Sequence, residues 1–253
     1  MNVDEALATV LQRLSDDQVR ALAAACERLN SPGARIAQVV TGVPPGTAGA
    51  IIALATAWRL EPDLTGSGVA LALRLGLAAR RDADSRRPRP VWTGPRTFGE
   101  QRLTAAVLHE LLVSAQERIL LVSYAAYTLP EVAADLEAAV ERGCRVDTVF
   151  ETNEDSAGLY TGPHRPFAHI GGISRWRWPS EQRDEGAVLH AKLLVIDGQR
   201  AFLGSANLTA RALEHNLEVG VVTHDWHLAR QLEDHVQRLM STGILRQEGV
   251  GEP

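Results

Sequence analysis

The first third of the chain repeats apolar residues at helical spacing. Leu7, Val10 and Leu14 lie three or four positions apart, as one face of an α-helix requires. Similar segments follow between breaks that contain glycine and proline, over residues 16–26, 34–40, 47–60 and 68–83. Because the alternation typical of a strand is nearly absent, residues 1–82 are predicted to form a small, all-helical N-terminal domain.

From about residue 97 the pattern alternates between strand and helix. The near-continuous apolar run over 118–124 is typical of a strand that is buried on both faces. Further strands are expected over 144–150, 174–178, 189–196, 201–203 and 217–222. Helices are expected over 100–117 and 225–240, and a third helix is expected to begin at Pro130. This alternation predicts a layered α/β domain over residues 97–253.

An arginine- and proline-rich stretch separates these two parts. Residues 80–96 contain six arginines, two aspartates and three prolines. Residues 83–96 are therefore predicted to be a solvated linker, and the stretch is also suited to binding phosphates as a basic arm. The candidate nucleic-acid contacts are Arg86, Arg87, Arg89 and, in a later loop, Arg165.

The charge balance conceals one unusual residue. The 253 residues include 26 basic and 31 acidic side chains, a net charge of −5, so a basic field over the whole molecule is excluded. Twenty-five of the 26 basic residues are arginine, and Lys192 is the only lysine. The sequence therefore has no P-loop of the kind that ends in Gly-Lys-Ser/Thr.

Cysteine content and hydropathy exclude further classes of protein. Cys26 and Cys144 alone cannot form a structural zinc site, and a disulfide framework is not expected in a chain of this length. The N-terminus lacks the basic region of a signal peptide, and the longest uncharged run is interrupted by Pro44 and Pro45. We therefore expect a cytoplasmic protein with no membrane segment.

The only lysine belongs to an ordered set of polar residues. The set reads His190-x-Lys192-x4-Asp197-x6-Gly204-Ser205-x-Asn207, with Glu218 downstream. An imidazole can attack phosphorus and hold a covalent intermediate, and a lysine ammonium can neutralise a phosphate oxygen. Amide and hydroxyl groups can donate to the same oxygens, and a carboxylate can fix the tautomer of the histidine. This chemistry needs no metal or other cofactor.

Single residues of this region also have structural explanations. Asp197 before a glycine is an ordinary turn residue. Trp176 and Trp178 share one face of a predicted strand, where packing in the core is favoured over stacking with bases. Tyr124, which ends the first buried strand, is suited either to the mouth of a site or to packing.

The conjunction of these residues resembles the HKD motif of the phospholipase D superfamily, over residues 90–245. This resemblance implies a mixed β-sheet flanked by helices. The whole chain is also similar to the phospholipase D-like component of DISARM phage-defence systems. That similarity rests on the helical front, the stretches 41–45 and 63–66, and the Trp92-Thr-Gly-Pro segment.

The resemblance implies a homodimer, because family enzymes build one site from two motifs and this chain has only one. His190 of one subunit would act as nucleophile through a phosphohistidine, and His190 of the partner subunit as general acid and then base. The resemblance also implies roles for the other members of the set: Lys192 and Asn207 hold the phosphate, Ser205 supports them, Glu218 orients His190, and Asp197 belongs to the catalytic motif but has a structural role.

The expected function is a metal-independent phosphodiesterase, a nuclease that acts on DNA or RNA in anti-phage defence. One alternative is a phospholipase D-type lipid hydrolase, although no convincing membrane-binding segment is found. The other is an interaction subunit that binds other defence proteins and whose activity is dispensable.

Overall fold

The computed structural model describes residues 1–29, 45–95, 103–127, 129–156, 158, 160, 162 and 165–249. These are called the described residues below. The chain divides into two compact units, Met1–Ser85 and Arg86–Pro253.

Every regular element among the described residues of the first unit is a helix. Its helices are α1 (Val3–Arg13), α2 (Asp16–Arg28), α4 (Pro45–Trp58) and α5 (Gly66–Arg86). Asn2 and Ser15 begin α1 and α2 with capping boxes, which satisfy free backbone N–H groups. Trp58 and Leu73 are buried between the helices. Each helix coincides with a predicted pattern, whereas the predicted segment 34–40 lies outside the described residues.

Part of the predicted linker has regular structure. Within residues 83–96, α5 continues to Arg86 and strand β1 runs over Arg89–Thr93. β1 is an edge strand of the sheet, where Pro90 is tolerated although it cannot donate a backbone hydrogen bond. An edge strand that lies within an arginine- and proline-rich stretch resembles a linker in composition, which is why the sequence concealed it.

The second unit is built on an eight-stranded sheet with the order β1-β7-β6-β5-β2-β3-β4-β8. The remaining strands are β2 (Arg118–Ser123), β3 (Arg145–Phe150), β4 (Ile173–Arg177), β5 (Leu193–Ile196), β6 (Arg200–Gly204), β7 (Glu218–Thr223) and β8 (Arg246–Gln247). β2, β3 and β4 are parallel, and the other neighbouring pairs are antiparallel. β8 was not predicted, because two residues carry no periodic signal.

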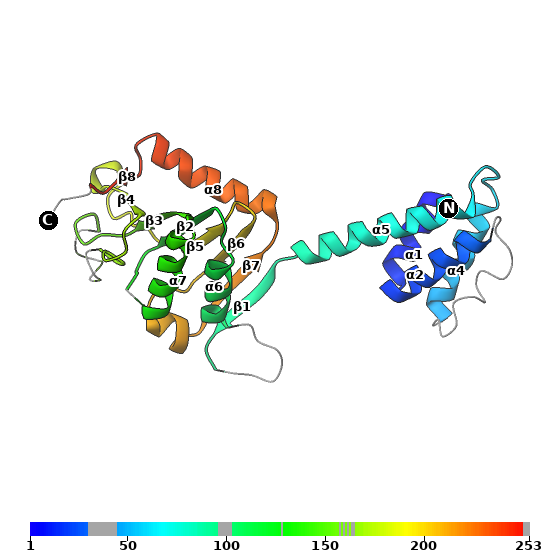
Figure 1. Cartoon of the computed structure of the whole chain (residues 1–253), viewed down its shortest axis with the longest axis horizontal. Coiled ribbons are helices and arrows are strands. Elements are labelled where there is room, and N and C mark those ends of the chain that lie inside the picture. The colour runs from blue at the N-terminus through cyan, green and yellow to red at the C-terminus, as the bar shows by residue number, and fades with distance from the viewer. Residues whose placement is uncertain are drawn as a thin grey trace. The chain divides into compact units, whose positions relative to one another are not determined.

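Helices cover both faces of this sheet (Figure 1). α6 (Thr104–Val113) and α7 (Pro130–Glu141) pack over one core, and α8 (Trp226–Ser241) packs over β5 and β6 on the other face. Trp176 and Trp178 pack against the core beneath α8, as favoured above. The predicted α/β class, a mixed sheet flanked by helices, is confirmed.

The α8 face of the sheet is only partly covered. Trp92 of β1 is aligned with Val219 of β7, and Val221 of β7 is aligned with Leu203 beneath α8. Trp92, Val219 and Val221 are 41%, 45% and 38% exposed. An apolar surface therefore extends from the part of the sheet beneath α8 across β7 to β1.

Candidate active site

The polar residues of the motif meet at one edge of the sheet, which is formed by the ends of neighbouring strands. β2, β5, β6 and β7 are neighbours in the sheet, and β5, β6 and β7 alternate in direction. His190 and Lys192 directly precede β5, Ser205 and Asn207 follow β6, and Glu218 begins β7. Because a strand that ends lies beside an antiparallel strand that begins, the fold brings these five residues together.

His190 and Lys192 lie outside the strand in which the sequence placed them. The strand predicted over 189–196 begins only at Leu193, which pairs with Val122 just before β2 ends. The Gly204 N–H donates to the Lys192 carbonyl at 3.3 Å. Lys192 Nζ donates to the His190 carbonyl at 2.8 Å, and the His190 side chain is exposed.

Tyr124 forms a wall of this site. Its ring centroid lies 5.2 Å from that of His190, and Lys192 Nζ lies 5.7 Å from the same ring centroid. The ring of Tyr160 meets Tyr124 edge-on at 5.8 Å. Of the two roles left open for Tyr124, the structure favours the mouth of the site.

Asn207 is oriented by the loop that follows β2. Its Oδ1 accepts the Ala125 N–H at 3.3 Å, and the neighbouring Leu208 N–H donates to the Ala125 carbonyl at 2.9 Å. Because Oδ1 faces a backbone donor, Nδ2 is the group that Asn207 can offer to a phosphoryl oxygen.

Glu218 is bonded to Ser205 rather than to His190. Ser205 Oγ donates to Glu218 Oε2, and Asn216 Nδ2 donates to Glu218 Oε1 at 3.0 Å. Among the described residues, no hydrogen bond joins Glu218 to His190. The proposed orientation of His190 by Glu218 therefore stays a prediction.

Burial affects the protonation of the lysine. Desolvation lowers the pKa of Lys192, and the negative charge of Glu218 opposes that change without cancelling it. The lysine is thus a half-buried cation beside an exposed histidine.

Asp197 lies at the opposite end of β5. At about 3.3 Å per residue, roughly 16 Å of chain separates it from Lys192. Its carboxylate accepts the backbone N–H groups of Gln116, Glu117 and Arg118 at 3.1, 2.9 and 2.8 Å. Its φ of 55° belongs to the left-handed region, as a tight turn before Gly198 requires. These contacts give Asp197 a structural role, away from the reacting groups.

Comparison with known families agrees with this arrangement. Residues 108–240 match the family model described as "Cardiolipin synthase, PLD-like domain", which covers more than half of the chain. The chain belongs to the phospholipase D-like family. The match includes every polar residue of the site described above.

The curated relatives of this phospholipase D-like chain include two bacterial enzymes. It is 25% identical to cardiolipin synthase B of Shigella flexneri over 136 residues, which cover 52% of this chain and 31% of that protein. It is 31% identical to cardiolipin synthase A of Pseudomonas aeruginosa over 128 residues, which cover 49% and 24%. The chain thus spans about a quarter to a third of the length of these relatives.

A solved structure shares the phospholipase D-like fold. NucT from Helicobacter pylori aligns with a TM-score of 0.51 at 18% identity, over 64% of this chain and all of that one. This likeness supports the fold assignment.

The arginines predicted to contact nucleic acid lie away from the motif. Arg89 pairs with Val222, whereas Thr93 at the other end of β1 pairs with Glu218, so Arg89 and the preceding Arg86 and Arg87 lie toward the far edge. Because β1 runs antiparallel to β7, these arginines lie away from the strand ends that carry the motif, and their contact with nucleic acid stays a prediction.

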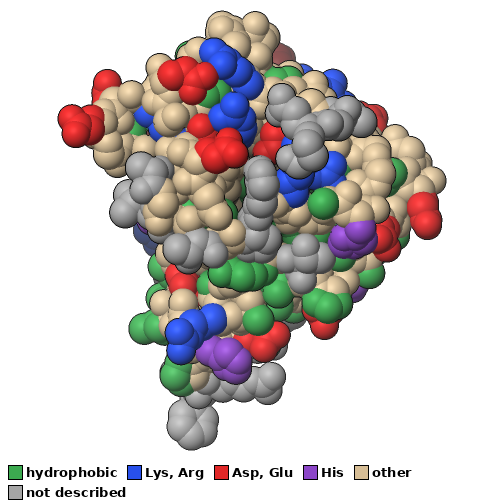
Figure 2. All heavy atoms as spheres, turned by 90° about the vertical axis from the view of Figure 1, so that its left-hand side faces the viewer, with side chains coloured by type: hydrophobic (Ala, Val, Ile, Leu, Met, Phe, Trp, Pro, Cys, Tyr) green, Lys and Arg blue, Asp and Glu red, His purple; other side chains and the backbone are tan. Residues whose placement is uncertain are grey.

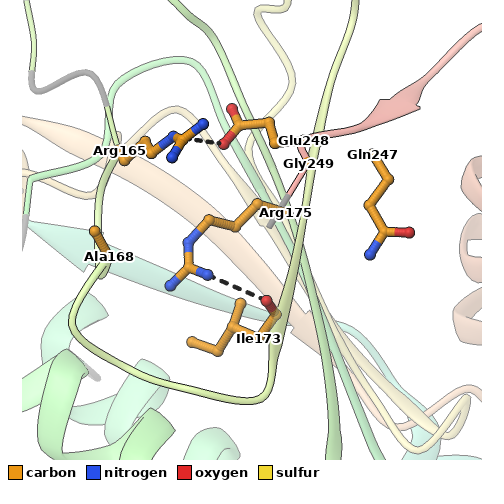
Figure 3. Close-up of a pocket in the computed structure, with 7 residues that line it drawn as sticks. All are labelled: Arg165, Ala168, Ile173, Arg175, Gln247, Glu248 and Gly249. Carbon is orange, nitrogen blue, oxygen red and sulfur yellow. Dashed lines mark hydrogen bonds and ion pairs between the residues drawn. The ribbon is translucent and has the colours of Figure 1, made fainter. Parts of the chain in front are cut away.

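Arg165 lies beside the start of β4. It forms an ion pair with Glu248 at 3.4 Å, in a small pocket of about 210 Å³ that Arg175 and Ile173 also line (Figure 3). Arg175 donates to the Ile173 carbonyl at 3.2 Å (Figure 3) and to the Ile170 carbonyl at 3.1 Å, so it holds the loop that precedes β4. Seen from the side where β4 and β8 lie, basic and acidic side chains stand next to one another rather than in a patch of one sign (Figure 2).

An apolar groove opens beside the phospholipase D-like motif. It encloses about 740 Å³ between the sheet and α8, with His190 and Lys192 among its lining residues. The rest of the lining is largely apolar and includes Leu203, Leu228 and Leu232. Sequence reasoning missed this groove, although the amphipathic pattern of α8 was visible.

In the part of the chain that the structure describes, no group of three or more His, Cys, Asp or Glu side chains is arranged to hold a metal ion. Within the same ranges, no helix is both long enough and apolar enough to cross a bilayer.

Proposed function

We propose that this protein hydrolyses phosphodiester bonds in nucleic acid without a metal ion. The observation that carries the proposal is the meeting of His190, Lys192, Tyr124 and Asn207 at one sheet edge. The histidine supplies the nucleophile, and the ammonium and amide donate to the non-bridging oxygens.

The proposed reaction has two steps. An imidazole nitrogen of His190 forms a bond to phosphorus while the P–O bond to the leaving alcohol breaks, and His190 of the partner subunit gives that alkoxide a proton. The same partner histidine then takes a proton from water, whose oxygen attacks phosphorus and breaks the P–N bond. Both histidines return to their starting states.

Aromatic side chains support a nucleic-acid substrate. Tyr124 lies beside His190, and Tyr127 is exposed on the same loop, where its N–H donates to the Leu208 carbonyl at 2.8 Å. Aromatic rings beside a phosphate site are suited to stacking with unpaired bases.

A homodimer supplies the second histidine in this proposal. The uncovered apolar surface of Trp92, Val219 and Val221 lies on the same face of the sheet as the groove beside α8. Burying it against a second copy would remove apolar area from water and bring two motif edges together.

A lipid phosphodiester is the second candidate substrate. This candidate is favoured by the apolar groove, which is large enough for part of an acyl chain and which Lys192 helps to line. The named relatives of the family, cardiolipin synthases, point in the same direction.

One experiment separates these substrates. Purified protein is incubated in EDTA with single-stranded DNA, duplex DNA, RNA, or vesicles of phosphatidylglycerol and cardiolipin, beside His190→Ala. Cleavage of nucleic acid that is lost in the variant supports the first proposal. Turnover of lipid alone supports the second candidate, and a wild-type protein inert in every arm contradicts both.

The dimer is tested with a charged substitution in the apolar surface. Val221→Arg is expected to give a monomer in sedimentation and to lose activity, since it places a charge within the proposed interface. Val113→Arg is the matched control, because Val113 is exposed on α6 across the sheet. A fully active monomer would contradict the shared site.

A role in anti-phage defence is proposed on the similarity of the whole chain to the DISARM component. Of the stretches behind that similarity, residues 41–44 lie outside the described residues. In a host that carries the complete system, His190→Ala is expected to abolish protection in a phage plating assay. Full protection by that variant would favour an interaction subunit that binds other defence proteins.

A further inference from the structure

A buried pair of opposite charges lies next to the segment that carries His190. Glu151 directly follows β3 and is 0% exposed, and the side chain of Arg183 is 2% exposed. Arg183 donates to both carboxylate oxygens of Glu151 at 2.8 Å. The pair is bidentate, which fixes the relative orientation of the two groups.

Burial of such a pair needs an explanation other than stability. Removing two charges from water costs about as much as their attraction returns, and apolar side chains of similar volume often stabilise a fold as well. What apolar side chains cannot do is direct hydrogen bonds to the surrounding backbone.

The hydrogen bonds of this pair surround the loop before His190. Glu151 Oε2 accepts the Leu189 N–H at 2.8 Å. Arg183 donates to the carbonyl groups of Asp155 and Ala187 at 3.3 and 3.4 Å, and also to that of Trp178. The pair therefore connects the end of β3 to both ends of the loop between β4 and His190.

A second carboxylate strengthens the start of the same loop. Asp155 accepts two hydrogen bonds from Arg177 and the N–H of Ser180 at 2.8 Å. Burial by itself raises the pKa of Asp155, but hydrogen bonds from Thr152, Arg177 and Ser180 outweigh it and lower the pKa below its ordinary value. Asp155 therefore stays ionised and keeps these contacts.

His190 lies outside the regular sheet, because β5 begins at Leu193. Among the described residues, the bond from the Gly204 N–H to the Lys192 carbonyl holds the segment on one side of His190, and the bond from the Leu189 N–H to Glu151 holds it on the other. We propose that the buried Glu151–Arg183 pair is a positioning device that holds His190 in line with the scissile bond through the Leu189 backbone. This inference rests on the proposed function of the same site.

The test compares two buried ion pairs within one domain. In Glu151→Leu with Arg183→Met, apolar side chains replace the pair, and we expect kcat to fall about 100-fold while KM changes little, since a small misplacement of a reacting group has that effect. Glu151→Gln keeps the shape but removes the charge that the bonds from Arg183 and Leu189 depend on, so kcat is expected to fall about 10-fold.

Asp147→Asn is the matched control. Asp147 is also 0% exposed and is paired with Arg118 at 2.8 Å, but its partners lie at the start of β2 and on β3 and β4. The control is expected to lower the unfolding midpoint and to leave kcat within twofold. Equal losses of kcat in Asp147→Asn and Glu151→Gln would overturn the proposal.

A second readout separates this inference from the proposed function. Hydrogen exchange of the Leu189 amide and the NMR line width of the His190 ring report the order of the segment without any substrate. Both are expected to change in Glu151→Gln and to stay unchanged in Asp147→Asn. An unchanged Leu189 amide in Glu151→Gln would overturn the positioning role even if the enzyme were inert toward every phosphodiester tested.

Discussion

The aromatic ring of Tyr124 lies 5.2 Å from the imidazole of His190 in a tilted arrangement. The centroid of the same ring lies 5.7 Å from Nζ of Lys192, so the side chain of Tyr124 lies beside both motif residues. Tyr124 follows β2 and is far from His190 in sequence, but β2 lies beside β5, the strand that His190 precedes. The tyrosine thus limits where the histidine and the lysine can move.

Removing this ring should weaken catalysis. Tyr124→Ala is expected to reduce kcat/KM about 10-fold, because a ring contact and a cation–π contact are lost together. Tyr124→Phe keeps the ring and should stay within about threefold of wild type. Steady-state kinetics on the preferred substrate checks both, and a fully active Tyr124→Ala would show that the ring only fills space.

Lys192 should give the activity an alkaline limit. Burial lowers the pKa of Lys192 below that of an ordinary, exposed lysine. As the pH rises through that lowered pKa, the ammonium loses its charge and phosphate binding weakens. The increase in KM should therefore begin at a lower pH than it would if Lys192 had the pKa of an exposed lysine. The measurement is the pH profile of kcat/KM from neutral to alkaline pH.

Lys192→Arg tests the shape of the cation. The guanidinium keeps its charge but is a wide planar group, so we expect a loss of about 100-fold at neutral pH and no alkaline limb from this position. Turnover near that of wild type would argue against a phosphate-binding role for the ammonium.

Ser205 and Glu218 should behave as one unit. Because Ser205 Oγ donates to Glu218, removing either partner breaks the same contact. In a double-mutant cycle, Ser205→Ala with Glu218→Gln is therefore expected to lose little more activity than the more damaging single variant. Additive losses would indicate that Glu218 acts separately, for example on His190 as the sequence predicts.

Asp197 should contribute to stability rather than to chemistry. Its carboxylate holds three backbone N–H groups at the start of β2. Asp197→Ala is expected to reduce the free energy of unfolding by about 2 kcal/mol, measured by urea denaturation, with kcat per folded molecule within about threefold. Asp197→Asn, which retains an acceptor and tolerates the turn, should be less destabilised. A loss of kcat without a loss of stability would contradict this role.

Local patterns predicted much of the fold. The apolar run over 118–124 predicts β2, and the helical spacing over 225–240 predicts α8, because side-chain periodicity records which faces are buried. The start of β5 was placed four residues early. Whether residues 189–192 join a strand depends on the length of β2 beside them, which periodicity within the segment cannot report.

The sequence by itself determined the motif. The order and spacing of His190, Lys192 and Asn207 are local, and the single lysine excludes a second motif in this chain. Only the tertiary structure decided what surrounds them: the ring of Tyr124 at His190, the buried Glu151–Arg183 pair, and the groove beside α8. The physical reason is that these contacts join strands that are distant in sequence, so they depend on strand order and register, which no single segment encodes.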